Sequence, residues 1–364
     1  MDSELILQDG SCFKGISFGA DISISGEVVF NTGMVGYPES FTDPSYAGQI
    51  LVLTYPLIGN YGVPSDEKDP FGIMKNFESD KIQIQALVVS EYSEGYSHYA
   101  AKKSLAKWLK ENNIPAISGV DTRALTKKLR EHGVMLGKIV MEKDNAKKIK
   151  MDDPNLRNLV AEVSIKEPVV YNNKPDSKKV ILVDCGAKNN IIRSLLIRGL
   201  TVIRVPWDYD FMSSEYEFDG IMLSNGPGDP KMCTSTISHI RKAIVKKIPI
   251  FGICLGNQLL ALAAGADTYK LKYGHRSQNQ PCYEVNTKRC YVTSQNHGFA
   301  VDEKKLPKDW LPWMKNANDG TNEGIMHKSG LFFSVQYHPE HMCGPTDNEY
   351  LFDKFVELLN KKSK

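Results

Sequence analysis

Residues 248–264 read Ile248-Pro-Ile-Phe-Gly-Ile-Cys-Leu-Gly-Asn-Gln-Leu-Leu-Ala-Leu-Ala264, and this run predicts an apolar strand followed directly by a helix. Its centre, Gly252-Ile-Cys-Leu-Gly256, has the pattern of a nucleophile elbow, a sharp turn with glycines where side chains would clash. The turn lifts the Cys254 sulfur out of the sheet edge to a helix N-terminus, where the dipole favours the thiolate. The backbone N–H of Leu255 is then available to a developing oxyanion. A buried structural cysteine is the alternative, but the flanking glycines favour a nucleophile.

The composition is ordinary for a globular protein. The chain has 364 residues, 41% of them hydrophobic, and a net charge of +2, which suggests two or three domains and no attraction to nucleic acid or anionic membranes. The N-terminus lacks the pattern of a secretory signal. Seven cysteines, none in a Cys-x-x-Cys pair, argue against a disulfide framework and a thiolate zinc site. A cytoplasmic location is therefore expected.

The N-terminal half predicts a β-rich α+β domain over residues 1–171. Short apolar or alternating runs predict strands, and amphipathic stretches between them predict helices. The expected strands cover 28–30, 49–54, 82–89 and 136–141, and the expected helices cover 99–110 and 123–131. A charged, proline-containing stretch ends this domain, and its last part, residues 172–178, is the predicted linker.

Residues 179–364 predict a second domain of α/β class. Apolar strands alternate with helices, which is typical of a mostly parallel, doubly wound sheet covered on both faces. The expected strands cover 180–183, 201–205, 220–223 and 248–253, and the expected helices cover 190–198, 235–247 and the run after Cys254. Further short strands at 280–295 and 331–337 precede a C-terminal helix at 347–361.

A nucleophilic thiol needs a base, and His338 is the best placed of eight histidines. It follows the predicted strand at 331–337 and precedes Pro339, which favours an extended backbone. Residues two apart in an extended segment point the same way, so Glu340 can orient the imidazole. A polar turn is the alternative reading. His341 and Cys343 match no common zinc spacing, so no metal site is predicted.

Three further loops could line such a site. Gly226 and Gly228 follow a predicted parallel strand, where ligands of open α/β sheets bind. Asn296 and Phe299 follow another strand and could offer backbone contacts and an aromatic wall. Ser45 lies in an N-terminal Asp-Pro-Ser-Tyr turn. Each loop taken alone is better explained as a simple turn.

Together these motifs resemble a known family. The elbow with Gln258, the run Ser-Asn-Gly-Pro-Gly-Asp-Pro at 224–230 and His338-Pro-Glu340 are similar to the triad-type (class I) glutamine amidotransferase domain. The stretches 26–37, 53–56, 121–126 and 294–301 resemble the small, glutamine-hydrolysing subunit of carbamoyl phosphate synthetase. The resemblance covers nearly the whole chain. Residues 34–39 and 57–62 are most similar to the animal-type multienzyme, in which this unit is fused to the synthetase, aspartate transcarbamylase and dihydroorotase.

The resemblance implies a reaction and a set of site residues. Cys254 would attack the side-chain amide of glutamine, His338 would transfer protons, and Glu340 would orient His338. Backbone N–H groups of Leu255 and Gly226 would hold the oxyanion. Glutamine would be held by residues from several loops: Ser45, Gly226, Gly228, Leu255, Gln258, Asn296, Gly298 and Phe299.

The resemblance also implies a partner. Ammonia would pass to a carbamoyl phosphate synthetase subunit or fused domain, which would bind ATP, Mg²⁺ and bicarbonate. This chain has no Gly-x-x-x-x-Gly-Lys loop, so no cofactor is expected in it. The product would serve pyrimidine synthesis or, alternatively, arginine synthesis.

One position departs from many relatives, which carry His where this chain has Asn257. A regulatory or scaffolding domain without turnover is therefore one alternative function. A hydrolase of γ-glutamyl peptides is another, although it would have no need of the N-terminal 170 residues or so.

Overall fold

The computed structural model describes residues 1–361 and divides the chain into two compact units. The first unit comprises Met1–Asp69 and Met74–Arg157, and the second comprises Pro70–Ile73 and Asn158–Lys364. Residues 158–171, predicted as part of the first domain, thus belong to the second unit. The reason is packing: Val160 of helix α4 (Leu159–Val163) lies in the second unit's core, and strand β12 (Val169–Tyr171) pairs with a strand of its sheet.

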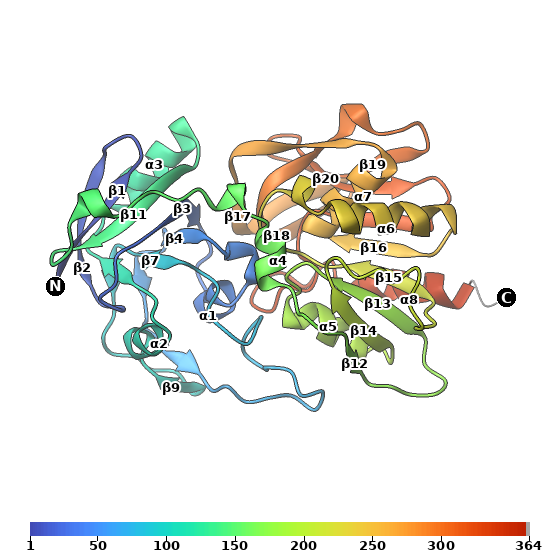
Figure 1. The fold of residues 1–364 in the computed structure, drawn as a ribbon, viewed down its shortest axis with the longest axis horizontal. Coiled ribbons are helices and arrows are strands. Elements are labelled where there is room, and N and C mark those ends of the chain that lie inside the picture. Colours follow the sequence, from blue (N-terminus) through green and yellow to red (C-terminus); the bar gives the residue numbers. More distant parts are fainter. Residues whose placement is uncertain (362–364) are drawn as a thin grey trace. The chain divides into compact units, whose positions relative to one another are not determined.

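The first unit is built on a closed barrel (Figure 1). Strand pairs β3·β4, β4·β7 and β7·β10 are parallel, and the other pairs are antiparallel. In barrel order the strands are β1 (Asp2–Leu7), β11 (Met135–Met141), β3 (Ile24–Asn31), β4 (Gln49–Leu53), β7 (Ala86–Val88), β10 (Ala116–Ser118) and β2 (Cys12–Ser17). The β-rich first domain is therefore confirmed.

Helices and short strands complete the first unit. Leu105 and Leu109 of helix α2 pack with barrel residues such as Leu51 and Leu87 in one apolar cluster. The helices are α1 (Tyr37–Phe41), α2 (Leu105–Glu111) and α3 (Thr122–His132); the short paired strands are β5 (Leu57–Ile58) with β8 (Glu91–Tyr92), and β6 (Val63–Pro64) with β9 (Ala101–Lys103).

Two predicted elements of this unit differ from the structure. The helix expected at 99–110 begins only at Leu105, because Ser104 caps it by accepting a hydrogen bond from the Lys107 N–H, and residues 101–103 form a strand. Of the residues 82–89 expected to form a strand, only Ala86–Val88 do so. The helix expected at 123–131 is confirmed: Asp121 caps its start and Gly133 follows its end.

The second unit contains a ten-stranded sheet. Its centre, β14-β13-β15-β16-β21, is parallel, and antiparallel strands extend it on both sides. In sheet order the strands are β12 (Val169–Tyr171), β14 (Thr201–Pro206), β13 (Lys179–Asp184), β15 (Gly220–Leu223), β16 (Ile250–Ile253), β21 (Phe332–Val335), β20 (Asn322–His327), β19 (Trp310–Asn316), β17 (Asp267–Glu284) and β18 (Cys290–Asp302).

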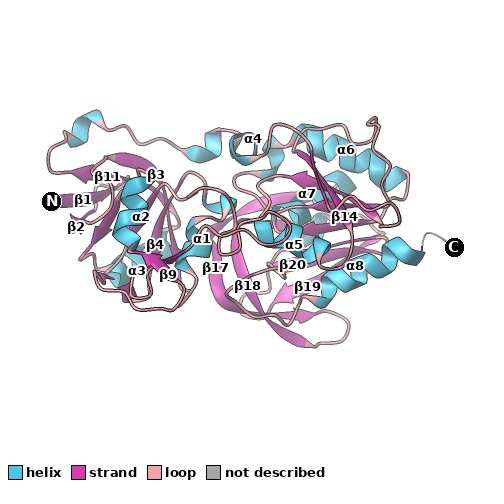
Figure 2. Cartoon of the chain, turned by 90° about the horizontal axis from the view of Figure 1, so that it is seen from below, coloured by secondary structure: helices cyan, strands magenta, loops and turns pink. Residues whose placement is uncertain are grey.

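Helices cover both faces of the parallel centre (Figure 2). Val180 and Leu182 of β13 pack on one face with α5 and α8, whereas Ile181 and Val183 pack on the other face with α6 and α7. This alternation is the two-residue period of a strand. The helices are α5 (Asn189–Leu196), α6 (Thr234–Val245), α7 (Leu255–Ala264) and α8 (Tyr350–Lys361). The doubly wound α/β domain is confirmed.

Strands after α7 are more extensive than expected. Strands β19 and β20 were not predicted, and β17 begins at Asp267 rather than near residue 280. Within residues 1–361, no helix is both long and apolar enough to cross a membrane.

Candidate active site

The elbow is formed as predicted. Strand β16 ends at Ile253, helix α7 begins at Leu255, and Cys254 between them has a φ of 55°, a conformation that is uncommon for a residue with a side chain. A Cβ on Gly252 would lie 2.6 Å from the Gly256 oxygen, and a Cβ on Gly256 would lie 2.3 Å from the Leu223 oxygen. Both glycines are therefore required for the turn to close.

The Cys254 thiol lies at the start of α7, against a neighbouring strand. Its backbone N–H donates to the Val335 oxygen at 2.9 Å, and its Sγ donates to the Asn296 oxygen at 3.6 Å. The residue is only 1% exposed. The thiol is thus buried, because the backbone of strand β18 lies against it.

The predicted base and its orienting carboxylate are paired. His338 Nδ1 and Glu340 Oε1 are 2.7 Å apart, and both residues are buried. The His338 backbone N–H donates to the Ser294 oxygen at 2.9 Å, which ties this segment to strand β18. His338 Nε2 makes no hydrogen bond of regular geometry, so this nitrogen remains for the thiol or a substrate.

Charges around His338 oppose one another. Burial and the Lys188 charge lower the pKa of His338. Glu340 and Cys254 raise it by more, so the pKa of His338 lies above its usual value. The pKa of Glu340 lies far below its usual value, because the charges of Lys188 and His338 outweigh the effect of burial. Cys254 is therefore close enough to His338 to act on its protonation.

Lys188 was not predicted as a site residue. Its Nζ lies 2.8 Å from Glu340 Oε1, and the two side chains are 1% and 0% exposed. Lys188 precedes helix α5, at the carboxyl end of parallel strand β13. That position was the available signal, since ligands of open α/β sheets bind at this edge.

The loop of Gly226 and Gly228 lies next to the elbow. A Cβ on Gly226 would lie 2.1 Å from the Cys185 oxygen and 2.8 Å from Leu255 Cδ2. Gly228 has a φ of +82°, which few other residues adopt. Leu255 is the first residue of α7, where N–H groups lack intrahelical acceptors. The two predicted oxyanion donors therefore belong to contacting segments.

Gln258 and Asn257 belong to a buried hydrogen-bond network. Gln258 Nε2 donates to the Phe299 oxygen at 2.9 Å and to Gln336 Oε1 at 3.1 Å. Asn257 Nδ2 donates to the same Gln336 oxygen at 3.1 Å, and Asn257 Oδ1 accepts from Ser334 Oγ at 2.8 Å. The residue that replaces histidine thus joins α7 to β21 and the segment after it.

The predicted residues of strand β18 lie beside Cys254 and Gln258. Asn296 supplies the carbonyl that accepts from Cys254, and Phe299 supplies the one that accepts from Gln258. Asn296 pairs with Arg276 of β17, and a Cβ on Gly298 would lie 3.4 Å from that guanidinium. The structure therefore brings together Cys254, His338, Glu340, Gly226, Leu255, Gln258, Asn296 and Phe299.

Ser45 belongs to the other unit. It lies in a 3₁₀ turn (Pro44–Tyr46), where its N–H donates to Asp43 Oδ1 at 2.9 Å. Its contact with glutamine stays a prediction.

One group in the described residues has a spacing suited to a metal ion. Donor atoms of His275, His297 and Glu323 lie within 4.8 Å of one another, and all three residues are buried. His275 Nδ1 is 3.3 Å from Glu323 Oε1, and His275 Nε2 is 2.8 Å from Asp319 Oδ2. Both distances also suit an imidazolium bridging two carboxylates, and this cluster was not predicted from the sequence.

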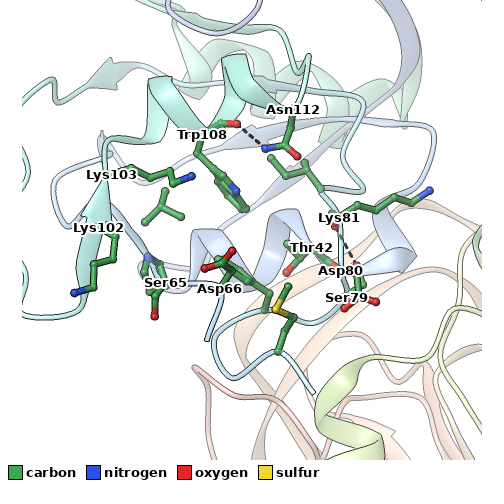
Figure 3. Close-up of a pocket in the computed structure, with 15 residues that line it drawn as sticks. Thr42, Ser65, Asp66, Ser79, Asp80, Lys81, Lys102, Lys103, Trp108 and Asn112 are labelled. Atoms are coloured by element: carbon green, nitrogen blue, oxygen red, sulfur yellow. Dashed lines mark hydrogen bonds between the residues drawn. The ribbon is translucent and has the colours of Figure 1, made fainter. Parts of the chain in front are cut away.

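A cavity of about 480 Å³ lies in the first unit (Figure 3). Trp108 lines it, together with polar side chains that include Asp66, Lys103 and Asn112. Asn112 Nδ2 donates to the Trp108 oxygen at 2.8 Å. None of the predicted site residues lines this cavity.

Comparison with known proteins identifies the families that the two parts of the chain match. The family model for glutamine amidotransferase class-I matches residues 181–358. The second unit is therefore a class-I glutamine amidotransferase domain. The family model for the carbamoyl-phosphate synthase small chain, CPSase domain, matches residues 5–139.

Curated relatives extend the match over almost the whole chain. The carbamoyl phosphate synthase arginine-specific small chain of Neosartorya fischeri is 51% identical over 358 residues, 98% of this chain and 79% of that protein. The chain belongs to the carbamoyl-phosphate synthase small chain family, as the sequence motifs predicted.

Longer relatives match as well. Multifunctional protein CAD of Squalus acanthias is 58% identical over 355 residues, 97% of this chain. The chain spans only 16% to 21% of the length of four such multifunctional relatives. Among solved structures, a glutamine amidotransferase from Thermotoga maritima aligns with a TM-score of 0.39 and 18% identity, over 51% of this chain and 86% of that one.

Proposed function

We propose that this chain is the glutaminase component of a glutamine-dependent carbamoyl phosphate synthetase. It hydrolyses glutamine to glutamate and ammonia and passes the ammonia to a synthetase partner. The observation that carries this proposal is the Cys254 elbow beside the His338–Glu340 pair, whose Nδ1–Oε1 distance is 2.7 Å. A strained nucleophile, a base and an orienting carboxylate are the three roles that acyl transfer requires.

The reaction begins with the Cys254 sulfur attacking the side-chain carbonyl carbon of glutamine. The N–H groups of Leu255 and Gly226 stabilise the oxyanion. The carbon–nitrogen bond breaks, His338 gives its proton to the leaving nitrogen, and ammonia departs. A water molecule then attacks the γ-glutamyl thioester while His338 takes a proton from it. The carbon–sulfur bond breaks, and glutamate and the Cys254 thiolate are regenerated.

The remaining predicted residues hold the substrate. Gln258 acts indirectly, since its Nε2 is bonded to the Phe299 oxygen and fixes that segment of strand β18. Direct contacts to glutamine come from Gly228, Asn296, Gly298 and Phe299.

The partner is a synthetase subunit or fused domain, which binds ATP, Mg²⁺ and bicarbonate. We favour pyrimidine synthesis as the pathway, because the chain is 58% identical to a multifunctional relative and 51% identical to an arginine-specific one. We also propose a cytoplasmic location, which agrees with free thiols at all seven cysteines.

The substitution Cys254→Ser in the complex with the synthetase tests this function. Glutamine-driven carbamoyl phosphate synthesis should fall by about a thousandfold or more, as for loss of a catalytic nucleophile. Ammonia-driven synthesis should be unchanged, because the partner then receives its substrate from solution. Cys290→Ser, a substitution at an exposed thiol, is the matched control and should affect neither rate. Equal loss of both activities in the Cys254 variant would contradict the proposed roles.

A further inference from the structure

Lys188 is an unusual residue to find buried. Its Nζ contacts the same oxygen, Glu340 Oε1, that His338 Nδ1 contacts, at 2.8 Å and 2.7 Å respectively. The second oxygen, Glu340 Oε2, has no hydrogen-bond partner and is also buried. A buried carboxylate needs opposite charge nearby, and here two potential cations share one oxygen.

The local backbone fixes the position of this lysine. Asp184 Oδ1 accepts from the N–H groups of Gly186 and Ala187, at 2.9 Å and 2.7 Å, and closes the turn before helix α5. The Lys188 N–H donates to Asn225 Oδ1 at 3.0 Å, next to the Gly226 loop. The lysine is thus anchored at its backbone as well as at its charged end.

Counting charges shows what Lys188 does during a turnover. In the resting site the charges of Glu340 and Lys188 cancel, and Cys254 and His338 share one proton between them. In the thioester the sulfur is neutral and His338 has given its proton to ammonia. Glu340 and Lys188 still cancel, so the neutral imidazole is favoured and can accept a proton from water. Without Lys188, the buried Glu340 charge would be balanced only by keeping His338 protonated.

We propose that Lys188 is a positioning residue that balances the Glu340 charge, so that His338 is neutral and can act as the base that hydrolyses the thioester. The inference rests on the proposed function. Its chemistry is that of the second half-reaction: the water oxygen bonds to the acyl carbon, its proton moves to His338, and the carbon–sulfur bond breaks.

Other titratable groups near His338 could also affect its pKa. Besides Glu340, Lys188 and Cys254, the neighbours are His341 on the same loop and His297 on strand β18, which both interact with His338. Burial lowers the pKa of His341 and of His297 well below the usual value, so both are neutral at pH 7. Lys188 is therefore the charge that lowers the pKa of His338.

The test compares wild type with Lys188→Met in the complex with the synthetase, between pH 6.5 and 9.5. The variant should hydrolyse glutamine about tenfold or more slowly at pH 7 and recover as pH rises, because one unit of pKa changes the neutral fraction tenfold. Acid-quenched samples analysed by intact mass should contain a larger fraction of γ-glutamyl thioester than wild type. Lys305→Met, which removes a surface ion pair with Asp267, is the control and should change neither readout.

The double variant Lys188→Met/Glu340→Gln removes both charges and guards against loss of folding in the single variant. It should turn over slowly but without the alkaline shift and without extra thioester, since no unbalanced charge then holds a proton on His338. Lys188→Arg, which keeps the charge, should resemble wild type in pH profile.

Three results would overturn the inference. One is an equal loss at every pH in the single variant without thioester accumulation. Another is an alkaline shift that persists in the double variant, and the third is an alkaline shift in Lys188→Arg. Absence of glutamine hydrolysis in wild type with its partner would instead overturn the proposed function, and the inference with it.

Discussion

Cys254 combines a strained backbone with tightly packed glycine neighbours. A φ of 55° at a residue with a side chain costs on the order of 1 kcal/mol, and such strain is concentrated at functional sites. The strained backbone fits only because residues 252 and 256 are glycines. A Cβ at these positions would lie 2.6 Å and 2.3 Å from backbone atoms. At the scale of the residue, the turn at Cys254 can therefore form only because positions 252 and 256 carry no side chain.

Gly226→Ala tests the loop beside the elbow. The new Cβ would lie 2.1 Å from the Cys185 oxygen, so the loop must move and carry its N–H away from the oxyanion. We expect glutamine hydrolysis to fall by about a hundredfold, the loss typical of removing one oxyanion donor. Gly95→Ala is the control, because its Cβ would meet nothing within 4 Å. Unchanged turnover in Gly226→Ala would exclude this loop from the oxyanion site.

Sequence reasoning reached the nucleophile and its base because both lie in local patterns. Glycines flank Cys254, and His338 and Glu340 are two residues apart in an extended segment. Lys188 was not predicted as a site residue because its partner Glu340 is distant in sequence, and a lysine after a strand usually faces solvent. The burial of Cys254 was not predicted either, since strand β18 covers the thiol only in the folded unit.

At the scale of the element, buried polar side chains connect the strands after α7. His275 of β17 contacts Glu323 of β20 at 3.3 Å and Asp319 in the preceding turn at 2.8 Å. Its ring lies edge-on to His297 of β18, with centroids 4.9 Å apart. These strands are therefore linked by charge as well as by their backbone pairing.

This link predicts a pH dependence of stability. Contacts with Asp319 and Glu323 outweigh the effect of burial and raise the pKa of His275 to about 9. A raised pKa stabilises the fold below the unfolded value of 6.5, and this contribution is lost as pH rises through about 9. The free energy of unfolding should thus fall by on the order of 3 kcal/mol over this window.

The comparison with His275→Gln isolates that contribution. The variant should be less stable than wild type at pH 6 and should lose less stability than wild type between pH 6.5 and 9.5, as measured by urea unfolding. A wild type and variant with parallel pH profiles would show that His275 is not the titrating group.

Sequence patterns predicted the parallel strands well and these antiparallel strands poorly. Strands buried on both faces read as continuous apolar runs, as in 180–183. Strand β17 instead carries buried polar residues, His275, Arg276 and Ser277, inside the unit. Polar residues with buried partners cannot be distinguished from loop residues in a sequence.

At the scale of the whole molecule, the chain enters the second unit twice. Residues 70–73 interrupt the first unit, and Ile73 is a 4% exposed member of a core cluster that includes Phe251 and Phe333. The core around the catalytic sheet is thus completed by a segment from the N-terminal half. Nothing in the sequence reveals this, because an isoleucine reads the same whichever core it enters.

Ile73→Ala should therefore destabilise the second unit. A buried isoleucine truncated to alanine costs about 2–5 kcal/mol, and the loss should appear as faster hydrogen exchange in β16 and β21. Ile84→Ala, which truncates a residue of the first unit's core, should instead speed exchange in barrel strands such as β4 and β7. The same exchange pattern in both variants would contradict the separate cores.

The most direct test of the account is covalent labelling by an electrophilic glutamine analogue, with the modified residue mapped by mass spectrometry. We predict one label per chain on Cys254, slowed by excess glutamine and abolished by Cys254→Ser. With Cys254 intact, His338→Asn should slow labelling at pH 7 by about a hundredfold, since the base that accepts the thiol proton is gone. A glutamine-protected label on any other residue, or none on Cys254 in the presence of the synthetase, would contradict the assignment of Cys254 as the nucleophile.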